Sequence, residues 1–231
     1  MKKGYQGKGI GTQVFQAVMD YVGNRNVGLA SVPDKIHLYR DKLGFKVPEK
    51  HHMIVQMGKI DLQQFQRHLS EDDISSVKVQ SLDCESESIW PQIFDYDSKL
   101  FSYQRDKKLL RLCLTEPNSY SMIALNSQGH SVGFGCVKED SGGHAMLAPL
   151  YADNETIALI LITNLLAKYT KANPSCHDTV MYILHSNSQA MRLVKKLNFE
   201  SHEECPRFFT KSTIDFDYNK LYGILSPNFS L

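Results

Sequence analysis

The chain has 231 residues and a net charge of +1, with 42% hydrophobic and 22% charged residues. This length allows one or two domains, and this charge provides no strong field that would attract nucleic acid or an anionic membrane. The most apolar run, residues 157–167, is shorter than the roughly 20 residues of a membrane-spanning helix. The chain start shows no apolar signal region, the five cysteines form no CxxC pair, and the nine histidines show no metal-ligand spacing. We therefore expect an intracellular, cytoplasmic protein without a metal, nucleic-acid or membrane partner.

A glycine-rich stretch near the start, residues 4–11, contains four glycines in eight residues. The apolar positions 14, 15, 18, 19 and 22 behind it fit a 3.6-residue period and predict a helix from residue 12 to residue 22. A glycine loop that runs into a helix presents backbone N–H groups at the positive end of the helix dipole, where phosphate binds well. The loop fits neither the G-x-x-x-x-G-K-[ST] pattern nor the G-x-G-x-x-G pattern.

The residues behind this helix predict a short strand at 26–31 and a second helix that starts at Pro33. Gly44 suits the left-handed position after the end of that helix. A further strand is expected at 53–60. The order in this part of the chain is therefore glycine loop, helix, strand, helix, strand.

The glycine loop contains the pattern Gln6-x-x-Gly9-x-Gly11, which resembles the pyrophosphate loop of the GNAT superfamily of acyl-CoA N-acyltransferases. The resemblance implies that the chain uses acetyl-CoA as co-substrate and that its pyrophosphate is bound by Gln6, Gly7, Lys8, Gly9, Ile10, Gly11 and Thr12. The alternative is a flexible loop that caps a helix.

A second motif supports the resemblance, because a helix in GNAT domains typically ends in Leu-Tyr-x-Lys-x-Gly-Phe. This chain has Leu38-Tyr39 and then one residue more than usual before Lys42-Leu43-Gly44-Phe45. The resemblance implies that Tyr39 is the catalytic acid that protonates the thiolate of coenzyme A. The alternative places Tyr39 on the packed face of the helix.

From residue 77 onward, periodicity and turn signals predict eleven more elements. They are a strand at 77–82, helices at 89–101 and 105–114, strands at 120–125, 131–138 and 144–151, a helix at 157–169, a strand at 179–184, a helix at 188–197, and strands at 207–210 and 220–225. This is the element order of a GNAT domain, and the first sixty residues repeat its second half.

The repeat is visible in the sequence, where Lys42-Leu43-Gly44-Phe45 matches Lys196-Leu197-Asn198-Phe199. We therefore expect an α/β fold with a mixed sheet, built as a tandem GNAT protein. Residues 1–60 (the first segment) form the C-terminal half of one GNAT domain, residues 61–76 connect, with one short helix, and residues 77–231 (the second segment) form a complete domain. We expect the second segment to fold by itself and the first segment not to.

The second segment departs from the enzyme pattern. It has no Q-x-x-G-x-G loop, and Val194 stands where the tyrosine is expected. Asp97-x-x-x-Phe101-x-x-x-Arg105 looks like a motif of tandem-GNAT proteins, although a salt bridge between helices is the favoured interpretation. The first segment lacks the strands that precede the pyrophosphate loop in the family.

The resemblance implies an N-acyltransferase, most simply an N-acetyltransferase, that transfers the acyl group directly to a small-molecule or peptide amine. The residues identify neither this amine nor the general base. The alternative is a non-catalytic coenzyme A-binding or protein-interaction module, or an inactive shortened isoform.

Overall fold

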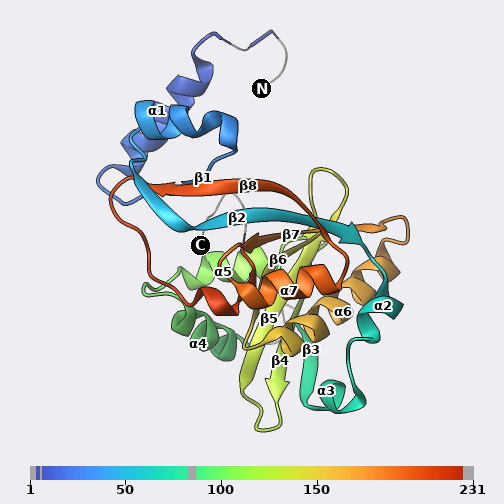
Figure 1. The fold of residues 1–231 in the computed structure, drawn as a ribbon. Helices are drawn as coiled ribbons and strands as arrows, with labels where there is room; N and C mark the ends of the chain where they lie inside the picture. Colours follow the sequence, from blue (N-terminus) through green and yellow to red (C-terminus); the bar gives the residue numbers. More distant parts are fainter. Residues whose placement is uncertain (1–3, 6, 83–86, 226–231) are drawn as a thin grey trace.

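The computed structural model describes residues 4–5, 7–82 and 87–225 (Figure 1). Its elements follow in chain order: α1 (Ile10–Val22), β1 (Gly28–Ala30), η1 (Pro33–Lys35), η2 (Leu38–Lys42), β2 (Val47–Lys59), α2 (Leu62–Gln66), α3 (Glu71–Ser75), β3 (Val77–Leu82), α4 (Trp90–Leu100), α5 (Lys107–Leu114), β4 (Tyr120–Asn126), β5 (Ser131–Glu139), β6 (Ala145–Ala152), α6 (Glu155–Ala172), β7 (Asp178–Leu184), α7 (Ser188–Lys196), β8 (Glu200–Phe209), η3 (Tyr218–Lys220) and β9 (Leu221–Gly223). The predicted order of helices and strands is confirmed in both segments.

One nine-stranded sheet organises the molecule, in the order β1-β8-β2-β7-β6-β5-β4-β3, with β9 added beside β6. The pairing of β6 with β7 is parallel. The other pairs of named strands are antiparallel. The predicted α/β fold with a mixed sheet is therefore confirmed.

The middle of the sheet interleaves the two segments. β2 belongs to the first segment but pairs with β7 on one edge and with β8 on the other. In the described part of the chain, β8 pairs with β1 and β2, which both come from the first segment. The expected boundary after residue 60 thus separates neighbouring strands of one sheet, and the division into a half unit and a complete unit stays a prediction.

The matched tetrapeptides adopt the same local conformation in the two segments. Gly44 and Asn198 follow helical turns and have φ angles of 84° and 57°. Glycine, and less often asparagine, adopts this left-handed conformation after a helix end. The aromatic residues that follow, Phe45 and Phe199, are both buried before β2 and β8 begin.

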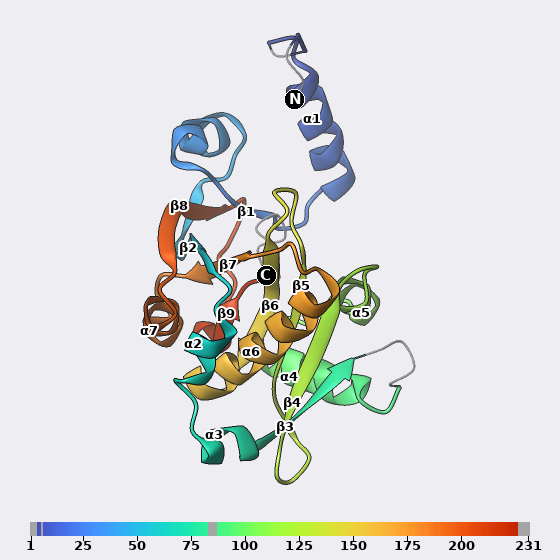
Figure 2. The same ribbon diagram turned by 90° about the vertical axis from the view of Figure 1, so that its right-hand side faces the viewer.

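Helices α1 and α6 occupy corresponding positions in the two segments but differ in burial. Ten residues of α6 are buried, and this helix lies across β4, β5 and β6. None of the described residues of α1 is buried, and α1 projects away from the sheet (Figure 2). The main core therefore lies around α6.

Four elements differ from their predicted form, among them β8, which begins at Glu200 instead of residue 207. The second helix of the first segment consists of a 3-10 turn and a π-helical turn, and residues 61–76 contain two short helices instead of one. β2 begins at Val47, earlier than predicted. Its inward-facing positions include Glu49 and His51, and these polar side chains hide the hydrophobic alternation that marks a strand.

Candidate functional site

The glycine loop leads directly into α1. Gly7 and Gly9 have φ angles of 76° and 72°, and no atom lies within 4 Å of a Cβ built on either residue. Gly9 precedes the first helical residue, and its carbonyl accepts the first intrahelical bond from the N–H of Gln13 at 3.0 Å. No described side chain caps this helix start, and no acidic residue lies in its first turn. The exposed N–H groups can therefore bind an anion.

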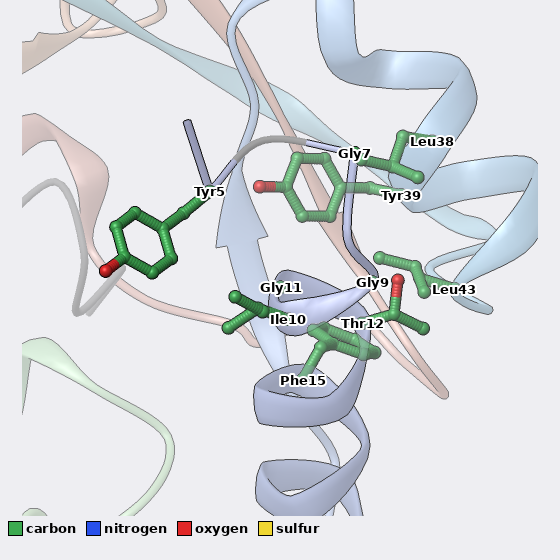
Figure 3. Close-up of a pocket in the computed structure, with 10 residues that line it drawn as sticks. All are labelled: Tyr5, Gly7, Gly9, Ile10, Gly11, Thr12, Phe15, Leu38, Tyr39 and Leu43. Atoms are coloured by element: carbon green, nitrogen blue, oxygen red, sulfur yellow. The ribbon is translucent and has the colours of Figure 1, made fainter. Parts of the chain in front are cut away.

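A cavity of about 510 Å³ lies between this loop and η2 (Figure 3). Its walls combine backbone of the loop with apolar side chains. It is lined by Tyr5, Gly7, Gly9, Ile10, Gly11, Thr12, Phe15, Leu38, Tyr39 and Leu43. Five of the seven predicted pyrophosphate-loop residues and the predicted acid therefore surround one cavity.

Of the two remaining loop residues, Lys8 does not line the cavity. The ammonium group of Lys8 lies 5.5 Å from the centre of the Tyr5 ring on the exposed surface. Gln6 lies outside the described residues. Residue types alone did not identify Tyr5, Phe15, Leu38 and Leu43 as wall residues. The sequence offered one signal for two of them. Phe15 lies four residues after Gly11, and Leu43 lies four residues after Tyr39, so each pair is expected on one helix face.

Tyr39 lies in the π-helical turn Leu38–Lys42. The N–H of Leu43 donates to the carbonyl of Leu38 at 3.1 Å, five residues earlier. A π turn absorbs one additional residue in a helix, which accounts for the extra residue noted before Lys42. Tyr39 therefore faces the cavity although the motif is one residue longer than usual.

The Tyr39 side chain has features of both predicted roles. Its ring packs edge-on against Phe45 at 6.3 Å, which matches a packed face. Its hydroxyl points toward Tyr5 at the open side of the cavity (Figure 3). The geometry leaves this hydroxyl able to donate a proton to a group bound there.

Asp97 and Arg105 form a buried ion pair beside the second segment's core. The carboxylate of Asp97 accepts from Nε of Arg105 at 3.0 Å, and both side chains are over nine-tenths buried. Arg105 also donates to the hydroxyl of Tyr151 at 3.3 Å, while burial raises the pKa of Tyr151 to about 12. The expected salt bridge is therefore present, although it is buried and Arg105 lies in the loop between α4 and α5. Val194 is buried in α7 and has no proton to donate.

Within the described residues, no three His, Cys, Asp or Glu side chains gather in a way that could hold a metal ion. Over the same residues, every helix is too short or too polar to cross a bilayer.

Comparison with solved structures finds the same fold in acetyltransferases. A putative acetyltransferase from Pyrococcus horikoshii is similar with a TM-score of 0.67 and 20% identity, covering 99% of this chain and 69% of that one. A tandem GNAT protein from the clavulanic acid biosynthesis pathway gives 0.61 and 11%, covering 90% and 71%. A GCN5-related N-acetyltransferase from Sphaerobacter thermophilus gives 0.55 and 13%, covering 98% and 71%. At these identities the likeness concerns the fold.

The sequence comparison identifies the family. No curated protein sequence matches the chain. Residues 93–223, more than half of the chain, match the family model of the acetyltransferase (GNAT) domain. This match lies within the second segment and does not include the glycine loop. The chain thus belongs to the GNAT acetyltransferase family.

Proposed function

We propose that this protein is an acyl-CoA-dependent N-acetyltransferase whose acetyl-CoA site lies in the first segment, at the cavity beside residues 7–12. The observation that carries the proposal is the uncapped, uncharged start of α1 at this cavity. Backbone N–H groups at such a helix start attract phosphate oxygens, and glycine lets them approach closely. The glycine loop and its open surroundings fit a pyrophosphate.

Each residue has a defined role in this proposal. Acetyl-CoA supplies the activated acetyl group. The N–H groups of residues 7–12 bind the pyrophosphate, with Gln6 extending the loop, and Lys8 adds a screened attraction at the surface. Phe15, Leu38 and Leu43 exclude water from one side of the cavity. The Tyr39 hydroxyl donates a proton to the thiolate leaving group. The acceptor is a small-molecule or peptide amine.

The proposal includes a tandem origin, with residues 1–60 as the C-terminal half of a GNAT domain and residues 77–231 as a second, complete copy. The sheet order β1-β8-β2-β7 supports it. In this proposal β1 corresponds to β7 and β2 to β8, so the pairing of β1 with β8 corresponds to the pairing of β7 with β2. The surface of α1 supports it as well. Val14, Val18 and Tyr21 are exposed by 60%, 50% and 81%, although corresponding positions in a packed helix face a sheet. In this proposal, strands equivalent to β4–β6 would cover that surface.

Calorimetric titration with coenzyme A tests the site. Gly9→Val places a β-branched residue at a φ of 72°, and a second change, Gly11→Val, adds a branched side chain at a position that lines the cavity. We expect the double variant to lose binding. Gly129→Val is the matched control, since Gly129 also has a positive φ and open surroundings but lies in the turn between β4 and β5. Unchanged affinity in the double variant would contradict the assignment. Binding without acetylation of any amine in a panel of small amines and peptides would favour a coenzyme A-binding module.

A further inference from the structure

The second segment contains its own candidate place for a ligand, between β6 and β7. These strands run parallel and pair through residues 145–147 and 179–181. Beyond these residues β6 continues to Ala152 and β7 to Leu184, and helices α6 and α7 follow them. In open α/β sheets, ligands bind outside the carboxyl ends of parallel strands, near the starts of the helices that follow. A phosphate-containing ligand of the second segment would be expected at this gap.

The chain's own strand β9 occupies the gap. Gly223 and Leu221 pair with Leu150 and Tyr151 of β6. On the other side, the N–H of Ile224 donates to the carbonyl of Tyr182 in β7 at 2.9 Å. Residues 221–224 thus bond to backbone groups of both diverging strands, where a ligand would bind.

Side chains fix this segment in place. The Asn187 side chain is fully buried, and its amide donates to the carbonyls of Asn219 and Leu221, each at 3.0 Å. Gly223 lies so close to β6 that an added Cβ would be 2.9 Å from the carbonyl oxygen of Leu147. Leu221, Tyr222 and Ile224 are fully buried. An occupant this tightly packed cannot be displaced without exposing a large apolar surface.

The charged side chains at this gap are already paired with one another. Glu155 lies in the first turn of α6, where its carboxylate pairs with Lys196 and lies 3.5 Å from Arg192. Asp153 pairs with Lys220 of the inserted segment at 2.9 Å and accepts from the hydroxyl of Tyr96 at 3.0 Å. The helix start thus already carries carboxylates, and the nearby cations neutralise them. A pyrophosphate at this position would have to compete with these carboxylates for the cations.

We propose that residues 218–225 are a permanent internal occupant of the gap between β6 and β7, so that the second segment binds no acyl-CoA. This inference deepens the proposed function and rests on it for the position of the one remaining site. According to this inference, the second segment has a structural role, because it provides β7 and β8, between which β2 is inserted.

Hydrogen exchange measured by mass spectrometry on the full chain tests this inference. We expect slow exchange in residues 218–225 at a rate that acetyl-CoA does not change, in the wild type and in the Gly9→Val/Gly11→Val variant. Exchange in 218–225 that accelerates by roughly tenfold with acetyl-CoA, as an opening of the segment would cause, would overturn it. Protection by acetyl-CoA at residues 153–157 in the double variant would overturn it as well. If residues 7–12 and 218–225 both remain unaffected in the wild type, the proposed function fails while this inference stands.

Discussion

The first segment has the same order of helices and strands as the second segment from α6 onward, but the chain enters α1 and α6 differently. Before α1, the loop has glycines with positive φ angles and no acid in the first helical turn. Before α6, Asn154 caps the helix through its side chain, and Glu155 supplies a negative charge in the first turn. The first junction has no side-chain cap among its described residues, whereas at the second Asn154 accepts from the N–H of Ile157 and a carboxylate already lies in the first turn. An anion site therefore depends more on which backbone N–H groups a helix start leaves without a partner than on the order of helices and strands around it.

The same contrast appears in packing. α6 is buried in the main core, and α1 is exposed along its length. The first segment nevertheless contributes β2, which lies between two strands of the second segment. Stability and ligand binding are thus divided within the first segment, with β2 serving the fold and the loop before α1 serving the proposed site.

The largest expected effect comes from removing residues 1–60. This deletion removes β1 and β2, the strands with which β8 pairs in the described structure. We expect the shortened chain to show no cooperative thermal unfolding by circular dichroism, because the loss of β2 leaves β8 without its partners and the edge of β7 open. Sequence alone favoured the opposite outcome, since residues 77–231 carry the full element order.

Removing residues 1–25 is the matched control for that deletion. It eliminates α1 and keeps both strands of the first segment. We expect the midpoint of unfolding to change by only a few degrees, roughly the effect of losing about 1 kcal/mol. A cooperative melt of residues 61–231, or a collapse caused by loss of α1 alone, would contradict this account.

A pair of substitutions compares the two helices directly. Leu161 in α6 is fully buried, and Leu161→Ala should lower the free energy of unfolding by about 2–5 kcal/mol because it leaves a cavity. Val18 in α1 is 50% exposed, and Val18→Ala should change it by no more than about 0.5 kcal/mol. Urea unfolding measures both values. Equal losses would show that α1 is packed in solution.

A smaller loss of stability is expected at acidic pH, through protonation of His51 in β2. Burial lowers the pKa of His51 below its ordinary value of 6.5, so the folded protein binds fewer protons than the unfolded chain between these two pKa values. The stability that depends on neutral His51 is therefore present above pH 6.5 and decreases as the pH falls toward the lowered pKa. The loss is at most about 1.4 kcal/mol per unit of pKa shift.

The variant His51→Phe isolates this contribution. It keeps an aromatic ring next to Tyr218, whose ring centre lies 4.4 Å from that of His51. We expect it to flatten the dependence of the urea midpoint on pH between 5 and 7. Substitution of the exposed His37 by Asn serves as the control and should leave that dependence unchanged. A His51→Phe profile identical to the wild type would refute the role of His51.

The smallest effect concerns Lys8. Its side chain is exposed, so Lys8→Ala should weaken binding of coenzyme A only a few-fold, corresponding to less than about 1 kcal/mol. The difference should disappear as salt is added, because salt screens an exposed charge. Lys171→Ala, at the far end of α6, is the control. Complete loss of binding in Lys8→Ala would move the main anion contact from the backbone to this side chain.

Sequence patterns predicted most of the fold and part of the site. The periodicity around α1 and α6 and the turn signals between β4, β5 and β6 identified these elements because local propensity and burial agree there. The insertion of β2 between β7 and β8 could not be predicted, since long-range pairing leaves no local signal. Glu49 and His51 further obscured the start of that strand.

The site shows the same limits. The loop's glycines and Tyr39 could be named from a motif, and the structure brings them to one cavity. The extra residue before Lys42 left the position of Tyr39 open, because only the π-helical turn determines which way the side chain faces. The closing of the second segment's gap by β9 depends on a pairing between β9 and β6, which are separated by about seventy residues. Such a contact has no signature in residue types.

An amide spectrum of the isotope-labelled chain, titrated with acetyl-CoA and followed by NMR, tests the contrast between the two helix starts most directly. The account predicts concentration-dependent shifts at residues 7–12 and at Tyr39, and unchanged signals at residues 153–157 and 221–224. Shifts at 153–157 or 221–224 without shifts at 7–12 would contradict it, because they would place the coenzyme at the start of α6 rather than at the glycine loop.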